Sequence, residues 1–361
     1  MFTGALREIM LPAILSAYGL KEELLEITSF GAGLINHTWR IKGPGQDFIL
    51  QRVNDDVFKH PEDIEENIRL IGSYLAEHHP GYLFVAPVKT TDKREMVQSP
   101  GNGYFRIFPF VKDSHTVTVV HNTLQAWEAA NQFGLFTKRL AGFPAGQLKI
   151  PLPDFHNLSL RYSQFLNALE NGNPDRIREC AAWIKITREQ YGIVKEYEMM
   201  KSDPAFKIRV THHDTKISNV LFDSMDRGLC VIDLDTVMPG YFISDVGDMM
   251  RTYLSPIGEE EPDYRQIKVR EDFFSAIVQG YLHEMKDELT ETEKTHFIYS
   301  GKFMIYMQAI RFLTDHLNND IYYGAKYSGH NLVRAGNQFT LLQRLLEKEP
   351  QLTRIQTKEC A

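Results

Sequence analysis

The stretch of sequence that decides the fold runs from residue 212 to residue 219 and reads HHDTKISN. It has the form H-x-D-x-x-x-x-N, which is the spacing of a kinase catalytic loop. In such a loop the aspartate, here Asp214, orients the attacking hydroxyl, and the asparagine five residues later, here Asn219, holds a metal ion that bridges the phosphates. Lys216 follows Asp214 closely, so its ammonium group can neutralise charge on the transferred phosphoryl group. The spacing predicts phosphoryl transfer, with Asp214 and Lys216 as catalytic residues.

A second acidic motif, VIDLD, follows at residues 231–235. Its apolar start predicts a buried strand whose end delivers carboxylates to Mg²⁺, a hard cation that prefers oxygen ligands. In addition to the asparagine of the loop, the predicted metal ligands are therefore Asp233 and Asp235. The alternative interpretation is that His212 and Asp214 make only local hydrogen bonds and that the two later aspartates cap a strand. Because two motifs with matching roles occur in the expected order, we favour the catalytic interpretation.

The composition is that of a globular protein that acts on small molecules. Of the 361 residues, 43% are hydrophobic and 24% are charged, which excludes a disordered or fibrous chain. The net charge is −7 and the basic residues are scattered, so we expect no nucleic-acid or membrane partner. The length predicts two packed lobes. The three cysteines lack CxxC spacing, which argues against a zinc site or a disulfide framework and is consistent with a reducing cytoplasm.

The order of the predicted elements is that of an α+β chain with a small antiparallel β-rich lobe, residues 1–111, and a larger, mainly helical lobe, residues 112–361. An amphipathic helix opens the first lobe, and its predicted strands cover residues 26–30, 35–42, 48–54, 83–90 and 103–111. A helix is predicted from Pro61, and its apolar face is formed by Ile64, Ile68, Ile71 and Leu75. In the second lobe, helical runs are predicted at residues 123–140, 175–197 and 302–317.

The first lobe is the expected nucleotide-binding lobe. Gly31 and Gly33 lie between its first two strands, where a glycine loop lets backbone N–H groups approach phosphates, although a tight hairpin turn is an equally good interpretation. Phe110, at the expected junction of the lobes, is also assigned to the nucleotide site. No GxxxxGK[ST] sequence is present, which argues against a P-loop enzyme.

The third predicted strand should supply a cation for the nucleotide phosphates, but it contains no lysine. Arg52 is the candidate, with a plain surface charge as the alternative. Gln51 must face the opposite way, because side chains alternate along a strand. The acidic partner of the cation is expected from the helix that begins near Pro61, with Glu66 as the first choice and Glu65 as the second.

The glycine turn, the H-x-D-x-x-x-x-N loop and the ID-x-D strand together resemble the aminoglycoside phosphotransferase and choline kinase superfamily, whose fold is protein-kinase-like. The similarity spans nearly the whole chain. Within this superfamily the chain is most similar to N-acetylhexosamine 1-kinases, and three stretches carry this narrower resemblance: SFGAGLINHTWRI with FILQRVN, VTHHDTKISNVLFD with VIDLDTVMPG, and LTDHLNNDIYYGAKYSGHNLVRAGNQ. It implies that ATP and Mg²⁺ are used to phosphorylate the anomeric hydroxyl of N-acetylglucosamine or N-acetylgalactosamine.

The resemblance also implies roles for individual residues. Asp214 would be the catalytic base, and Asp245 would brace the catalytic loop, with His212 as a further structural support. The implied sugar pocket consists of His37, Thr236, Tyr253, Arg311 and Tyr322.

Two of these assignments have ordinary alternatives when the residues are considered alone. Arg311 and Asp315 lie four residues apart on one helix face, so they form either an intrahelical ion pair or hydrogen bonds to sugar hydroxyls. Tyr253 and Tyr322 either stack on the sugar or pack in the core.

Two rival functions remain from the sequence. The first is a kinase of another small alcohol, such as an aminoglycoside, choline, methylthioribose or homoserine. A cationic acceptor would need an acidic pocket, which Glu259–Glu261 could supply, although a solvated face is the more ordinary interpretation of that run. The second rival is a non-catalytic nucleotide-binding protein on a kinase fold, and the intact Asp214, Asn219 and Asp233 argue against it.

Overall fold

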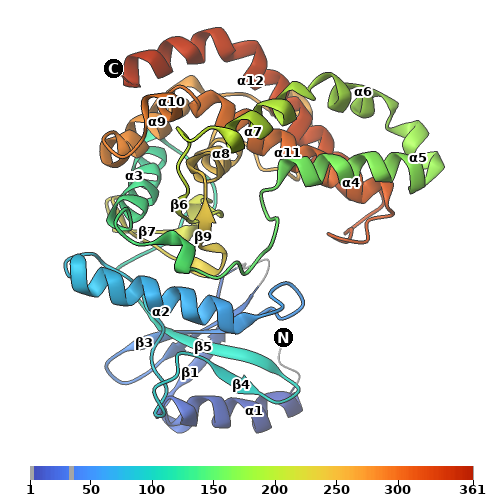
Figure 1. The fold of residues 1–361 in the computed structure, drawn as a ribbon. Coiled ribbons are helices and arrows are strands. Elements are labelled where there is room, and N and C mark those ends of the chain that lie inside the picture. Colours follow the sequence, from blue (N-terminus) through green and yellow to red (C-terminus); the bar gives the residue numbers. More distant parts are fainter. Residues whose placement is uncertain (1–3, 32–35, 361) are drawn as a thin grey trace. The chain divides into compact units, whose positions relative to one another are not determined.

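The structure is a computed structural model that describes residues 4–31 and 36–360. The chain forms two compact units, shown as a ribbon in Figure 1. The first unit comprises the chain up to Ser114 together with Gly146–Leu152 and Leu234–Met238, and the second comprises the remainder. The first is built around an antiparallel sheet and the second is mainly helical, so the predicted α+β class is confirmed.

The sheet of the first unit has five strands in the order β1-β2-β3-β5-β4, and each neighbouring pair is antiparallel. In the register of β3 against β5, Gln51 is paired with Arg106 and Leu50 with Ile107. The strands are β1 (Glu26–Ser29), β2 (His37–Lys42), β3 (Asp47–Val53), β4 (Val97–Ser99) and β5 (Gly103–Pro109), and the helical elements of this unit are α1 (Gly4–Ala17), η1 (Glu22–Leu24), α2 (Pro61–His78) and η4 (Leu234–Thr236).

Two helices lie on opposite faces of this sheet (Figure 1). α1 covers one face, where Leu15 packs in a core cluster with Leu50, Phe105 and Ile107. Because side chains alternate along a strand, Arg106 between Phe105 and Ile107 is turned to the opposite face. α2 has the predicted apolar stripe, and its Ile64, Ile68, Ile71 and Leu75 are all buried.

One predicted strand of the first unit is wrong. Residues 83–90 form no strand, and the fourth strand of the sheet is instead β4 at Val97–Ser99. Pro87 lies inside the predicted run and has no backbone N–H to give to a ladder, which favours an extended connection over a paired strand. The N–H of Val88 does donate to the Ile107 carbonyl, at 2.7 Å, so the segment touches the sheet at a single point.

The second unit packs long helices around a buried centre. α11 is buried over most of its length and packs against α4, α8 and α12, while α3 packs against α9. The helices are α3 (Thr123–Arg139), α4 (Leu158–Asn171), α5 (Pro174–Glu179), α6 (Ala181–Glu189), α7 (Gly192–Ser202), α8 (Phe242–Tyr253), α9 (Glu271–Met285), α10 (Glu291–Lys294), α11 (Phe297–Leu317) and α12 (His330–Cys360).

The short strands and 3₁₀ turns of the chain are β6 (Arg209–Thr211), β7 (Val220–Phe222), β8 (Gly228–Val231), β9 (Met238–Gly240), η2 (Ala145–Gln147), η3 (Ile217–Asn219) and η5 (Tyr264–Gln266). The single helical run predicted for residues 175–197 is in fact divided into α5, α6 and α7. Its breaks fall at Cys180 and at Gln190–Tyr191, where the backbone leaves the regular helical pattern.

The packing of α8 against α11 is close enough to exclude any side chain at one position. A Cβ atom at Gly247 would approach the Ser300 carbonyl far inside van der Waals contact. This glycine therefore lets α8 lie directly against the central helix of the unit, which fixes the helix that carries Asp245.

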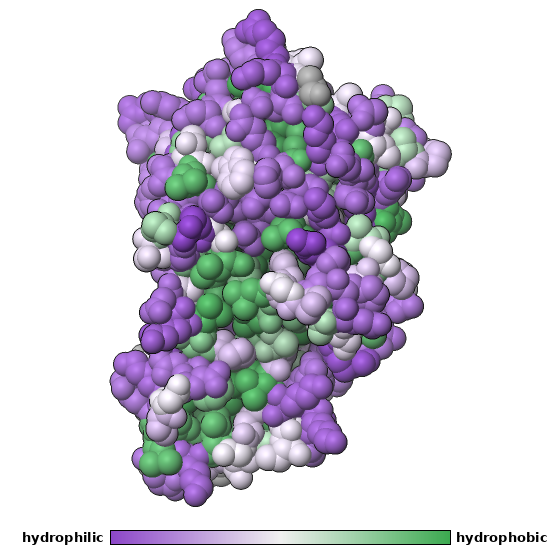
Figure 2. Space-filling view, turned by 90° about the vertical axis from the view of Figure 1, so that its left-hand side faces the viewer, coloured by the Kyte–Doolittle hydropathy of each residue, from purple (hydrophilic) through white to green (hydrophobic). Residues whose placement is uncertain are grey.

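The surface is mostly polar. In the view of Figure 2, hydrophilic residues cover most of the face, and hydrophobic residues gather in smaller patches. Among the residues that the structure describes, we find no helix that is both long enough and apolar enough to cross a membrane.

Candidate active site

The predicted catalytic loop lies in the second unit and is held by a buried carboxylate from α8. Asp245 accepts hydrogen bonds from the backbone N–H groups of His212, at 3.0 Å, and His213, at 2.7 Å, one at each oxygen. The Thr215 hydroxyl donates to the Asp245 carbonyl at 2.7 Å. Burial raises the pKa of Asp245 to about 7, although the two backbone donors act to lower it. Asp245 therefore fixes the backbone on both sides of Asp214.

His212 connects the loop to the end of β8. Its Nε2 lies 3.0 Å from the Ile232 carbonyl, and its Nδ1 lies 3.4 Å from the backbone N–H of Asp214. These contacts fit a neutral ring that donates from Nε2 and accepts at Nδ1. The ring is fully buried and meets the rings of Phe133 and Phe136 edge-on. Its surroundings are those of a structural support.

Asp214 is paired with the lysine of its own loop. The Lys216 ammonium lies 3.0 Å from one carboxylate oxygen, and the Asn219 Nδ2 group donates to the other at 3.1 Å. Burial acts to raise the pKa of Asp214, but Lys216 and other nearby cations outweigh it, so the pKa lies below its ordinary value. The carboxylate is therefore ionised at neutral pH and can accept a hydrogen bond from a hydroxyl.

The hairpin of β7 and β8 brings two of the predicted metal ligands close together in the fold. Val220 is paired with Val231, and the N–H of Ile232 donates to the Asn219 carbonyl at 2.9 Å. Asp233 follows directly after Ile232. Because Nδ2 of Asn219 donates to Asp214, its amide oxygen is the atom suited to a cation. An amide oxygen and a carboxylate are the hard donors that Mg²⁺ prefers, so these two residues fit that ion.

Two residues of this region adopt the left-handed backbone conformation that is unusual for side chains other than glycine. His213 has φ +66° and Asp233 has φ +61°. Such positions cost of order 1–3 kcal/mol and often occur at functional sites. Nδ1 of His213 lies 3.2 Å from Nδ1 of His156, and its Nε2 lies 2.7 Å from the Thr211 hydroxyl. Burial lowers the pKa of His156 well below its ordinary value, so this ring is neutral at pH 7.

A second acid–base pair of α8 supports the loop and was not predicted from the sequence. Asp248 accepts a hydrogen bond from the Thr215 N–H at 2.9 Å and is paired with Arg251 at 2.9 Å. Both side chains are almost fully buried. The spacing of Asp245, Asp248 and Arg251 was the available signal, because residues three apart lie on one face of a helix.

The cation expected from β3 is not paired with the expected acid. Arg52 lies 3.5 Å from Asp55 and donates to the Asn102 carbonyl at 2.6 Å. Glu66 lies 3.7 Å from Lys149 at the surface. The second choice, Glu65, accepts from the backbone N–H of Glu95. The predicted Arg52–Glu66 pair is therefore wrong, because each side chain has a nearer partner of opposite charge.

The buried cation of the first unit is Arg106, on β5. Its Nη2 lies 2.6 Å from Asp235, and the Gln51 side-chain oxygen accepts from its Nε at 3.1 Å. The other oxygen of Asp235 accepts from the Asn36 amide at 2.7 Å. Arg106 and Asp235 are both almost fully buried. The expectation that Asp235 ligates a metal is corrected here, since an arginine and an amide already engage both its oxygens.

The other residues assigned to the nucleotide site also belong to the first unit. Gly31 has φ +73° and a Cβ atom there would meet nothing within 4 Å, so its conformation rather than crowding favours glycine. Gly33 lies outside the described residues. Phe110 meets the ring of Phe30 edge-on and lies under the guanidinium group of Arg40, 4.1 Å from the ring centre.

The residues of the implied sugar pocket are divided between the units. His37 lies exposed on β2 and Thr236 lies buried in η4, both in the first unit. Tyr253, in the second unit, is fully buried, and its hydroxyl donates to the Thr215 carbonyl at 2.6 Å. Tyr253 cannot stack on a ligand from this position, so we reassign it to support of the catalytic loop.

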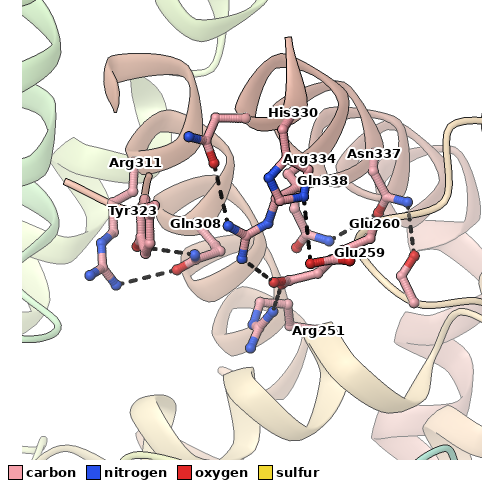
Figure 3. Close-up of polar contacts among 12 residues, drawn as sticks. Arg251, Glu259, Glu260, Gln308, Arg311, Tyr323, His330, Arg334, Asn337 and Gln338 are labelled. Atoms are coloured by element: carbon pink, nitrogen blue, oxygen red, sulfur yellow. Dashed lines mark hydrogen bonds and ion pairs between the residues drawn. The ribbon is translucent and has the colours of Figure 1, made fainter. Parts of the chain in front are cut away.

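Arg311 and Tyr322 belong to a cluster of aromatic and basic side chains in the second unit. The Arg311 guanidinium group lies 5.7 Å from the ring centre of Phe155, 5.9 Å from that of Tyr322 and 5.5 Å from that of Tyr323. Its Nη1 donates to Gln308, whose amide group donates to the Tyr323 hydroxyl (Figure 3). Tyr322 itself is 70% exposed, so its ring is available for contact.

The intrahelical ion pair considered for Arg311 and Asp315 is not formed. Asp315 instead accepts hydrogen bonds from the backbone N–H groups of Tyr322, at 2.7 Å, and Tyr323, at 2.9 Å, and from the amide of Asn331 at 3.0 Å. Asp315 thus shapes the loop after α11, and Arg311 has no carboxylate partner among the described residues.

Comparison with known proteins identifies the family. The profile of the Phosphotransferase enzyme family matches residues 26–283, which is most of the chain. The chain belongs to this family. The match includes the catalytic loop and both aspartates of the VIDLD motif, and its members are kinases of small molecules with alcohol groups as acceptors. This phosphotransferase is therefore a small-molecule kinase by family.

Solved structures of similar fold are of the same kind. An aminoglycoside phosphotransferase from Alicyclobacillus acidocaldarius has a TM-score of 0.62 at 11% identity, covering 96% of this chain and 95% of its own. A microcompartment-associated aminopropanol kinase has a TM-score of 0.62 at 16% identity, with 94% and 98% covered. An amicoumacin kinase in complex with AMP-PNP and Ca²⁺ has a TM-score of 0.60 at 14% identity, with 97% and 93% covered. At these identities the likeness shows the fold alone.

Proposed function

We propose that this phosphotransferase transfers the γ-phosphoryl group of Mg-ATP to the anomeric hydroxyl of an N-acetylhexosamine, giving the 1-phosphate and ADP. ATP is supported by the family and by the nucleotides bound to similar structures. The choice of acceptor is supported by the three stretches that resemble N-acetylhexosamine 1-kinases. It is supported further by the charge of the cluster around Arg311.

The chemistry would be carried by the second unit. The ionised Asp214 accepts the proton of the acceptor hydroxyl as its oxygen attacks the γ-phosphorus, and the bond to the β-phosphate oxygen breaks to release ADP. The Lys216 ammonium, 3.0 Å from Asp214, offsets charge on the transferred group. Asn219 and Asp233 would hold Mg²⁺, which neutralises phosphate charge and bridges the phosphate oxygens. Most of the rate would come from positioning.

In the first unit, we propose that Arg106 rather than Arg52 is the cation of the nucleotide-binding sheet. Arg106 is 1% exposed, and its Nη1 has no hydrogen-bond partner among the described residues. Buried guanidinium N–H groups are rarely left unpaired, so this atom is suited to an acceptor supplied by a ligand. Gly31, Gly33 and Phe110 remain candidates for contact with the nucleotide.

The observation that carries the choice of acceptor is the absence of a free acidic group around Arg311 in the described part of the chain. Arg161, like Arg311, has no carboxylate partner there, and its Nε is buried without a hydrogen bond. Glu259 lies between two arginines, and Glu260 is paired with Lys326 at 2.8 Å. A cationic acceptor would meet net positive charge, whereas sugar hydroxyl and acetamido oxygens can accept from arginine.

The same charge distribution weakens the principal rival. The acidic run at Glu259–Glu261 was the feature that made a choline or aminoglycoside pocket conceivable, and two of its three carboxylates are neutralised. A kinase of a neutral alcohol other than a hexosamine remains the alternative.

The test is ADP release from Mg-ATP against a panel that contains N-acetylglucosamine, N-acetylgalactosamine, glucose, galactose, choline and kanamycin. We expect turnover with the acetylated hexosamines, and phosphorus NMR should show an anomeric phosphate. Turnover confined to choline or kanamycin would overturn the charge argument. Turnover of glucose or galactose alone would retain a sugar kinase and reject the acetamido group as a requirement.

A further inference from the structure

The acidic run after α8 was expected to be solvated, but its first member is not. Glu259 lies between two guanidinium groups: one carboxylate oxygen is 2.7 Å from Nη1 of Arg251, and the other is 2.5 Å from Nη2 of Arg334 (Figure 3). The side chains of both arginines are largely buried, with 9% and 13% exposed. Burial acts to raise the pKa of Glu259, but the arginines outweigh it and the pKa is lowered, so the bridge is charged.

One side of this bridge leads to the catalytic loop. Arg251 holds Asp248 at 2.9 Å, and Asp248 accepts the Thr215 N–H, which is the residue after Asp214. Every side chain in this series is charged and buried, so removal of one member leaves its neighbour with an uncompensated charge. The backbone beside the catalytic aspartate therefore depends on Glu259 through two intermediates.

The other side of the bridge leads to the loop between α11 and α12, residues 318–329. Arg334 donates to the side-chain oxygen of Asn331 at 3.3 Å. The Asn331 amide group donates to Asp315, Asp320 and the Gly324 carbonyl, at 3.0, 2.9 and 2.9 Å. Since Asp315 also holds the backbone N–H groups of Tyr322 and Tyr323, the same series ends at the aromatic rings around Arg311.

We propose that Glu259 is a positioning residue that couples the order of the 318–329 loop to the geometry of the catalytic loop. The kinetic part of this inference rests on the proposed function, because it treats the 318–329 loop as part of the acceptor site. Contacts alone do not demonstrate coupling, so the proposal is stated through its energetic consequences. Glu259 does not touch the reacting atoms and acts through Arg251 and Arg334.

The first test needs no substrate. Hydrogen–deuterium exchange is measured on peptides that cover residues 212–219 and 318–329 in the wild type, Glu259→Gln and Glu260→Gln. Glu260 is the matched control, because it is the next residue, has the same charge and pairs with Lys326 at an exposed position. We expect Glu259→Gln to increase exchange in both segments and Glu260→Gln to leave both unchanged. Unchanged exchange in either segment of Glu259→Gln would overturn the coupling.

The second test separates the two sides of the bridge by kinetics with whichever acceptor is turned over. Glu259→Gln should lower kcat roughly 10- to 100-fold, the effect expected of a small misplacement of reacting groups, and should raise the KM of the acceptor. Arg334→Met keeps the Arg251–Glu259 pair, so it should raise the acceptor KM several-fold and leave kcat within about twofold. The double variant should resemble Glu259→Gln, because both substitutions interrupt one series.

The outcomes distinguish positioning from a loss of stability. If the single variants lower kcat and raise the KM of ATP in proportion to their loss of melting temperature, Glu259 is only structural and the proposal fails. If Glu259→Gln does not fold, Glu259→Asp and Arg334→Met carry the same exchange test. A panel without turnover would count against the proposed function alone, since the exchange experiment decides the coupling without an acceptor.

Discussion

At the scale of single residues, the catalytic aspartate is defined more by its neighbours than by the loop motif. Asp214 is kept ionised by Lys216, and Asn219 fixes one of its oxygens. His212 and Asp245 contribute no chemistry of their own but hold the backbone on which Asp214 lies. The same residue types at other distances would satisfy the motif and do nothing.

Asp214→Asn tests this assignment most directly. The substitution keeps an acceptor oxygen for Asn219 but removes the base, so we expect kcat to fall by about 10³-fold, within the range of general-base effects. Lys216 is partly exposed, so the lost ion pair should cost less than about 1 kcal/mol of unfolding free energy. Turnover and urea unfolding are measured in parallel. Near wild-type turnover in a folded variant would remove Asp214 from the mechanism.

At the scale of elements, the hairpins and helices that frame the loop leave little spare volume. Gly240, the last residue of β9, faces the ring of His213. A Cβ atom there would lie 2.5 Å from a ring carbon of His213 and 2.5 Å from the Thr211 hydroxyl. Since His213 already has a left-handed backbone conformation, it has little freedom to move away.

We therefore expect Gly240→Ala to displace the catalytic loop. Overpacking of this kind costs typically 1–3 kcal/mol of unfolding free energy, and kcat should fall with it. The control is Gly192→Ala at the start of α7, where a Cβ atom would meet nothing within 4 Å and alanine favours the helix. Urea unfolding and ADP release should both be unchanged or improved in the control. Wild-type values for Gly240→Ala would show that β9 does not restrict His213.

At the scale of the whole molecule, the proposed nucleotide machinery is divided along the chain. The segment from Leu234 to Met238 belongs to the first unit, whereas Asp233 belongs to the second. The proposed metal ligand and the buried Asp235 are therefore two residues apart in sequence but members of different packed units. A ligand that binds the native chain through Asp233 should stabilise that chain against unfolding by mass action.

The corresponding experiment measures the melting temperature with ADP in the presence and absence of Mg²⁺. At a ligand concentration near 100 times its Kd, binding should add about 2.7 kcal/mol of stability, and EDTA should abolish the increase. Asp233→Ala should lose the Mg²⁺-dependent increase, whereas Asp272→Ala, an exposed acid of α9, should retain it. An undiminished increase in Asp233→Ala would show that the metal is held elsewhere.

The sequence by itself determined the features that depend on neighbours along the chain. The apolar stripe of α2, the strands β2, β3 and β5, and the loop spacing from His212 to Asn219 are local patterns, and the structure contains each of them. The class of fold followed from their order. The strand expected at residues 83–90 failed because one proline outweighed an otherwise suitable apolar run.

Only the tertiary structure decided which charged groups are paired. Arg106 meets Asp235, and Glu259 joins Arg251 to Arg334, although long stretches of chain separate most of these partners. Tyr253 is buried for the same kind of reason, since α8 packs directly on α11. A local pattern states that a side chain is charged or aromatic. Its partner is chosen by the packing that excludes water around it, because a buried charge without a partner is too costly to persist.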